Sequence, residues 1–90
     1  RTAVRTYPAD VTARNNAALA ELETEHYDEA IALLKDTTEP SLQNLLGVAY
    51  FKKGRYGDAK AAFRRALDGG YAGAADNLKM AQEAEELLEE

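Results

Sequence analysis

The fold is decided between Gln43 and Ala66, where the sequence reads QNLLGVAYFKKGRYGDAKAAFRRA. Small or apolar residues recur three or four positions apart in each half of this stretch, which is the spacing of one helical face. The two faces consist of Leu46, Gly47 and Tyr50 in the first half and of Ala59, Phe63 and Ala66 in the second. Gly54 lies between the halves and favours a tight turn. The pattern therefore predicts two helices that approach closely at Gly47.

The same residues resemble the tetratricopeptide repeat, whose pattern is W-x2-L-G-x2-Y, followed by A-x3-F and then P. The match covers Leu46, Gly47, Tyr50, Ala59 and Phe63. It departs at the Trp position, which holds Gln43, and at the final Pro position, which holds Tyr71. The resemblance implies an all-α fold, a right-handed superhelix of antiparallel helix pairs. It also implies a protein–protein interaction module that binds a peptide or a partner protein.

A weaker copy of the pattern lies upstream. Residues 27–30, which read YDEA, resemble the start of the family's second helix, and Ala18 takes the place of Gly47. Tyr27 precedes Tyr56 by 29 residues, whereas the family repeat has about 34. The shortfall falls in residues 36–40, so we expect the second helix to end about one turn early.

Five helices follow from these patterns and from the glycines and prolines between them. We expect the first helix to begin at residue 9 or 10 and to end at residue 23, and the other four helices to span residues 27–35, 41–53, 56–68 and 72–88. Asp10 is the expected N-cap of the first helix, and Ser41 that of the third. In the turn after the first helix, Glu25 stands where the next turn has Gly54, so we expect a positive φ at Glu25.

The domain organisation predicted from this reading is a single helical domain at residues 9–90. Within it, repeat one covers residues 11–39, repeat two covers 40–71 and a capping helix covers 72–88. Residues 1–8 are interpreted as the tail of an upstream element or a linker, so that the chain is a fragment of a longer protein.

The residues of the capping helix that we expect to face the core are Leu78, Ala81, Ala84, Leu87 and Leu88. Those that we expect to face solvent are Glu83, Glu85, Glu86, Glu89 and Glu90. Asn77-Leu78 resembles the dipeptide before the repeat glycine, but Lys79 replaces that glycine, so the register of this helix stays open.

Composition excludes several classes of partner. The net charge of −5 argues against binding to nucleic acid. No apolar run approaches the ~18–20 residues that a membrane-spanning helix needs. The six bases between Lys52 and Arg65 are interpreted as a solvated helix face, with a patch that docks an acidic partner as the alternative. The absence of Cys is compatible with the cytoplasm and with the periplasmic side of a bacterial envelope.

No constellation of residues indicates catalysis or a cofactor. With one His and no Cys, a histidine–cysteine nucleophile pair cannot form. His26 lies in a turn among carboxylates without the spacing of a metal site. Gly69-Gly70 is not followed by the Lys-Ser/Thr of a phosphate loop. We therefore expect no enzyme activity, no metal and no cofactor.

The resemblance implies a concave groove lined by the first helix of each repeat. Carried over position by position, the groove residues are Asn15, Asn16, Leu19, Leu22, Asn44, Leu45, Val48, Phe51 and Lys52. Thr12, Glu23 and Ser41 lie beside them, and the last helix adds Asp76, Asn77 and Met80. Asn amides suit the backbone of an extended peptide, whereas the apolar residues suit a helix or an apolar side chain. Phe51 is the expected anchor.

Alternatives to this groove remain open. A tetratricopeptide subgroup grips the C-terminal carboxylate of chaperones, but Leu19 and Leu45 stand where that clamp has Asn, and Ser41 stands where it has Lys. The chaperone carboxylate is therefore disfavoured as a partner. The apolar groove residues could instead pack against an upstream repeat or the inner wall. The alternative function is a structural spacer or scaffold segment within a larger multidomain protein, for which the cell envelope is one candidate location.

Overall fold

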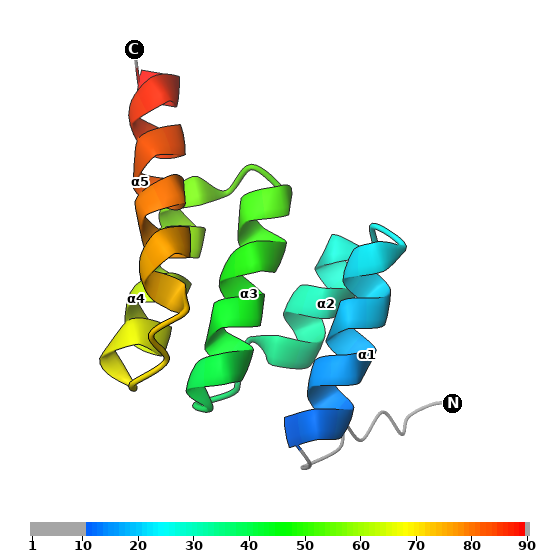
Figure 1. Cartoon of the computed structure of the whole chain (residues 1–90). Helices are drawn as coiled ribbons and strands as arrows, with labels where there is room; N and C mark the ends of the chain where they lie inside the picture. The colour runs from blue at the N-terminus through cyan, green and yellow to red at the C-terminus, as the bar shows by residue number, and fades with distance from the viewer. Residues whose placement is uncertain (1–10, 90) are drawn as a thin grey trace.

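The computed structural model describes residues 11–89 as an array of five α-helices (Figure 1). Their bounds are α1 Val11–Glu23, α2 Tyr27–Leu34, α3 Pro40–Lys52, α4 Tyr56–Asp68 and α5 Ala74–Glu89. No strand occurs in this range. The prediction of an all-α fold with five helices is confirmed. The expected N-cap at Asp10 and the expected upstream tail lie outside the described residues.

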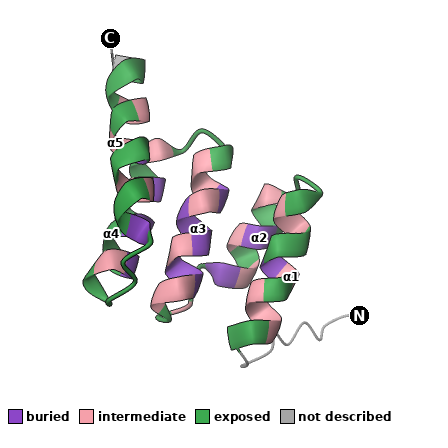
Figure 2. Ribbon diagram, viewed as in Figure 1, coloured by how far each residue is buried: buried purple, intermediate pink, exposed green. Residues whose placement is uncertain are grey.

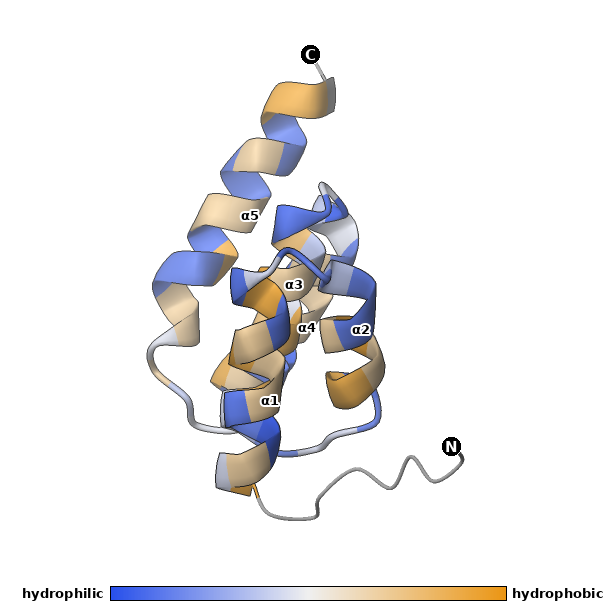
Figure 3. Cartoon of the chain, turned by 90° about the vertical axis from the view of Figure 1, so that its right-hand side faces the viewer, coloured by the Kyte–Doolittle hydropathy of each residue, from blue (hydrophilic) through white to orange (hydrophobic). Residues whose placement is uncertain are grey.

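The helices form two layers of antiparallel neighbours. α1, α3 and α5 lie in front in Figure 1, with α2 and α4 behind them. Turned to the side, Figure 3 places α1 and α5 toward one edge and α2 toward the other. α3 packs most extensively against α4, and α5 packs mainly against α4, with a smaller contact to α3. The front layer is therefore a continuous surface built from α1, α3 and α5.

The buried residues form two clusters that share the α3–α4 hairpin (Figure 2). The first cluster joins both hairpins and comprises Ala18, Leu34, Leu42, Leu45, Leu46 and Ala62. The second cluster joins α4 to α5 and comprises Ala59, Phe63, Ala66, Ala74 and Ala81. Tyr50 packs against both clusters. The helical faces quoted first from the sequence are therefore the faces that hold the layers together.

Gly47 is required where α3 crosses α4. A Cβ atom at this position would lie 2.4 Å from Cε1 of Phe63, which is closer than atoms can approach. In the first hairpin, the corresponding residues are Ala18 and Leu34, and both are fully buried. Ala18 is larger than Gly47 and Leu34 is narrower than Phe63, so the two pairs fill a similar space between their helices. The two hairpins thus reach close packing with different pairs of residues.

Three turns end with the same hydrogen-bonded motif. After α1, the Glu25 amide donates to the Leu22 carbonyl (3.0 Å) and the His26 amide to the Glu21 carbonyl (2.7 Å). The same pair of bonds follows α3 around Gly54 and α4 around Gly70. This is the Schellman motif, in which one residue adopts the left-handed conformation. The φ angles are 64° at Glu25, 82° at Gly54 and 101° at Gly70, so the prediction for Glu25 is confirmed.

The short spacing between the hairpins comes from α2, as expected. α2 has 8 residues, whereas α4 has 13. The segment after α2 is held by bonds to Thr37: its carbonyl accepts from Nε2 of Gln43 (3.2 Å), and its hydroxyl accepts from the Glu39 amide (3.0 Å). Gln43, at the family's Trp position, thus closes the shortened loop.

The prediction that Ser41 caps α3 is wrong, because α3 begins at Pro40 and Glu39 occupies the N-cap position.

The end of α5 differs from the prediction. Leu87 and Leu88 are 71% and 70% exposed and do not face the core. α5 has 16 residues against 13 in α4, and its last turns extend beyond the neighbouring helices (Figure 1). Glu85, in contrast, does not point freely into solvent, because its Oε1 lies 2.5 Å from Nζ of Lys60 on α4. Ala81 is buried, and Leu78 and Ala84 are half-buried, as expected.

Candidate functional site

Every residue predicted for the groove lies on α1, α3 or α5, the three helices of the front layer (Figure 1). The packing of α5 settles its register. Ala74 and Ala81, buried against α4, stand 32 residues after Leu42 and Ala49, which are buried in α3. The same step aligns Asn77-Leu78 with the dipeptide before Gly47, the resemblance that the sequence left open. Equivalent positions of the three helices can therefore be compared directly.

One apolar residue from each front helix occupies the same repeat position. Val48 on α3 is half-buried, Leu19 precedes it by 29 residues, and Met80 follows it by 32. Leu19 is 40% exposed and Met80 is 49% exposed, although both are large apolar side chains. We name these three residues the apolar row. Single exposed apolar residues are ordinary, but this row places one at the same position of every helix in the layer.

The amides beside the apolar row are partly used within the chain. Nδ2 of Asn77 donates to Oδ1 of Asn44 at 2.9 Å, in a partly buried bond that joins α5 to α3. Asn15 is half-buried and Asn16 is exposed. Two of the predicted groove residues therefore hold the front layer together, and their capacity to bond a partner's backbone is reduced.

Charged residues lie one helical turn from each member of the apolar row. Glu23 follows Leu19 by four positions, Lys52 follows Val48 by four, and Asp76 and Glu83 flank Met80. All four charged side chains are exposed, and none forms an ion pair within residues 11–89. Residues three or four apart share a helical face. The surroundings of the apolar row therefore carry three acids and one base, with the acids on the two outer helices.

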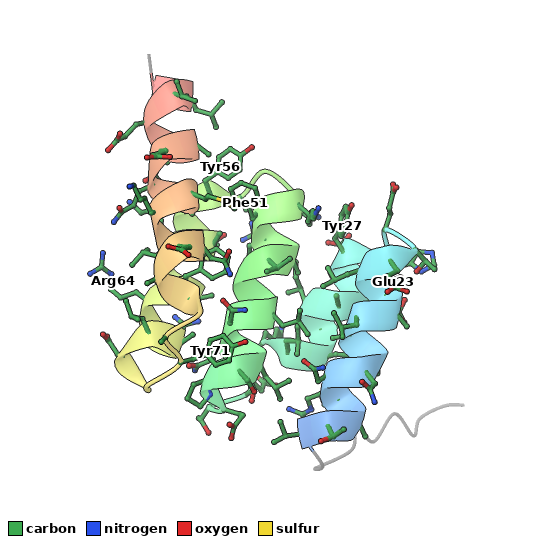
Figure 4. The ribbon with its side chains drawn as sticks, viewed as in Figure 1. Glu23, Tyr27, Phe51, Tyr56, Arg64 and Tyr71 are labelled. Atoms are coloured by element: carbon green, nitrogen blue, oxygen red, sulfur yellow. The ribbon has the colours of Figure 1, made fainter. Side chains whose placement is uncertain are left out.

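Four predicted groove residues take part in the core, and one of them is half-buried Val48, which packs against the second cluster. Leu45 is 8% exposed and belongs to the first cluster, and half-buried Leu22 packs against that cluster. Half-buried Phe51 packs against the second cluster, with its ring centroid 5.1 Å from that of Tyr56 (Figure 4). Leu45, Val48 and Phe51 therefore contact the core of the described helices, whereas packing of the apolar residues against an upstream repeat stays an open alternative. These core contacts make Val48 and Phe51 poorer tests of binding than Leu19 and Met80, the two exposed members of the apolar row.

Tyr71 is a surface aromatic that the sequence did not assign to the groove. It is 38% exposed, and Figure 4 shows it in front, between α3 and α5. A Cβ atom at Gly73 would lie 3.1 Å from Cε2 of Tyr71, so the glycine leaves room for the ring. The signal available in the sequence was the run of glycines around Tyr71, which predicts a loop but not the side to which the ring turns.

Three of the six bases between Lys52 and Arg65 form ion pairs within the described residues. Lys53 pairs with Asp28 (2.5 Å), Arg55 with Asp58 (2.6 Å) and Lys60 with Glu85. The guanidinium of Arg55 also lies 4.9 Å from the centre of the Tyr50 ring, within the range of a cation–π contact. Arg64 projects from α4 away from α3 (Figure 4). The exposed bases that remain on α4 are Arg64 and Arg65, and α4 lies in the back layer (Figure 1).

Other chemistry is sparse in the described part of the chain. His26 is exposed, and its Nδ1 lies 3.1 Å from Oε1 of Glu21 and 3.0 Å from Oγ1 of Thr24, so it belongs to the turn after α1. Within residues 11–89, no three His, Asp or Glu side chains gather in a way that could hold a metal ion. None of the described helices combines the length and apolar character needed to cross a bilayer.

The comparisons with known proteins identify one segment. Residues 40–68, which span α3 and α4, match the family model described as Tetratricopeptide repeat. The comparison with curated proteins gives no match.

Proposed function

Because residues 40–68 are a tetratricopeptide repeat, a unit that generally mediates protein–protein interaction, we propose that the chain binds a protein partner on its front layer. The proposed binding face consists of Asn15, Asn16, Leu19, Asn44, Val48, Phe51, Lys52, Asn77 and Met80. Leu22 and Leu45 support this face from beneath. In this proposal the chain has no catalytic activity and α5 caps the array.

The observation that carries the proposal is the apolar row. Leu19 and Met80 are about half as accessible as free side chains, although other residues of the same two helices are fully buried. Fully burying an exposed large apolar side chain is worth about 1.5–3 kcal/mol, and Leu19 and Met80, which are 40% and 49% exposed, retain less than half of that contribution for a partner. A partner that covered the apolar row would gain this reduced contribution from Leu19 and Met80 together. The mixed amide and charged surroundings supply the polar rim that protein interfaces have.

The experiment is capture of partners by the immobilised chain from an extract of its source, with groove variants alongside. We expect the double variant Leu19→Gln, Met80→Gln to lose the captured protein. Leu88→Gln is the matched control, because Leu88 is an equally large exposed side chain outside the apolar row. Circular dichroism melting verifies that all variants remain folded. A protein that is retained by the folded double variant would contradict the proposal, and capture of no protein would favour the spacer.

A further inference from the structure

We propose that the protruding end of α5 docks onto a second copy of this chain. In the proposed dimer, the end of each α5 lies against the basic turn between α3 and α4 of the other copy. The inference does not depend on the proposed function, because it uses no member of the apolar row. It follows from the position of the α5 end, from its exposed leucines and from the opposite charges of the two segments.

The end of α5 leaves an open step beside the turn between α3 and α4. Glu85 lies opposite the start of α4, because its Oε1 is 2.5 Å from Nζ of Lys60. A Cβ atom at Gly57 would also lie 3.2 Å from Oε2 of Glu85. Since α4 begins at Tyr56, the residues after Glu85 extend past its first residue, and Figure 1 shows the last turns of α5 passing the α3–α4 turn. The end of α5 and this turn are therefore the two sides of the step.

Both sides of the step are exposed. Leu87 and Leu88 are 71% and 70% exposed, more than any other large apolar side chain in the described part of the chain. Leu88 follows Ala81 by seven positions and shares its helical face, which is the face that packs on α4. On the other side, residues 52–55 are all exposed, and a Cβ atom at Gly54 would meet no atom within 4 Å. A second copy can therefore reach both sides.

The two sides of the step carry opposite charges. Residues 52–65 contain six bases and one acid, whereas residues 83–90 contain five acids and no base. One pair between these segments already forms inside the chain, that of Lys60 with Glu85. Lys52, Glu83 and Glu86 are exposed and form no ion pair within residues 11–89. The acids left over on α5 thus complement bases of the turn in another copy.

A two-fold arrangement satisfies both copies at once. An isologous dimer uses the same surface on each copy, so a surface with one acidic and one basic side is complementary to itself. The exposed leucines supply the apolar contact between the charged sides. Each copy contributes only a helix end and a turn, which is less than the ~1,200–2,000 Å² of stable interfaces. We therefore expect a weak dimer, and a monomer at the micromolar concentrations used for unfolding.

Sedimentation equilibrium of the whole chain measures the association. In about 0.05 M salt, we expect the 9.8 kDa monomer at about 10 µM and an average mass approaching that of a dimer at about 1 mM. Raising the salt to about 0.5 M should weaken the association at least fivefold, because salt screens exposed charges. A monomer at the highest concentration, or a mass that keeps rising beyond that of a dimer, would overturn the two-fold docking.

Variants of exposed residues assign the dimer to the step. Leu87→Gln combined with Leu88→Gln should weaken the association at least about tenfold. Glu83→Gln combined with Glu86→Gln should weaken it at least about fivefold and remove most of its salt dependence. Circular dichroism melting verifies that the variants remain folded. A dimer that persists in the folded leucine variant would overturn the proposal.

Two controls separate this inference from the proposed function. Arg64→Gln combined with Arg65→Gln removes two exposed bases from the second half of α4, away from the step, and should leave the dimer unchanged. Leu19→Gln alters the apolar row and should also leave the dimer unchanged. Loss of the dimer in either control would contradict docking at the step. The proposed function fails by a different result, which is partner capture that the apolar row does not affect.

Discussion

At the scale of single residues, close packing between the paired helices depends on matched sizes. Gly47 faces Phe63, and the equivalent positions of the first hairpin hold Ala18 and Leu34. The Cβ that Gly47 lacks would lie 2.4 Å from the Phe63 ring. An Ala in α3 is therefore compatible only with a narrower residue in α4, which is the combination that the first hairpin uses.

This match predicts a non-additive pair of substitutions. Gly47→Ala should destabilise the chain by about 1–3 kcal/mol through overpacking, and Phe63→Leu should cost about 1 kcal/mol or more through lost contacts. The double variant should be more stable than the sum of the two losses by at least about 0.5 kcal/mol. Urea unfolding of all four proteins measures the cycle. Strict additivity would mean that the two residues do not constrain each other.

Glu25 is a second residue whose backbone sets the expected outcome. Its φ of 64° is unfavourable for any residue with a Cβ. Glu25→Gly should therefore be neutral or stabilise the chain by up to ~1 kcal/mol. Glu25→Ala serves as the control, because it removes the same carboxylate without relieving the backbone. A loss of more than about 1 kcal/mol in Glu25→Gly beyond that in Glu25→Ala would contradict this explanation.

At the scale of helices, the sequence predicted the existence of each element better than its limits. The repeat comparison gave the early end of α2 and the positive φ of Glu25, since both follow from aligning two turns. It did not reveal that Leu87 and Leu88 are exposed. Periodicity identifies the apolar face of a helix, but the length of the neighbouring helix decides how much of that face is covered. α4 is shorter than α5, so the last turns of α5 have no helix opposite them.

The overhang of α5 gives a prediction about stability. Leu87→Ala and Leu88→Ala should each change the free energy of unfolding by less than about 0.5 kcal/mol, because neither side chain is buried. Leu34→Ala should destabilise by about 2–5 kcal/mol, since Leu34 is fully buried in the first cluster. Thermal and urea unfolding compare the three. Losses of similar size would show that the end of α5 packs against the array in solution.

At the scale of the whole molecule, the layered array follows from repetition of one hairpin, and this made the fold predictable. The candidate site was predictable only as a set of helices and positions. Family positions placed Leu19, Val48 and Met80 together, but the sequence could not show that Leu45 is buried or that Asn44 bonds to Asn77. Both facts depend on the distances between α1, α3 and α5, which are fixed only when the two layers pack together.

The most direct test of the account is an amide chemical-shift map of the 9.8 kDa chain during titration with a captured partner. We expect the largest shifts at and around Leu19, Val48 and Met80 on α1, α3 and α5. Arg64 and Arg65, exposed on α4, should shift little. Shifts concentrated on α2 and α4, with the apolar row unchanged, would show that the partner binds elsewhere and would contradict the proposed binding face.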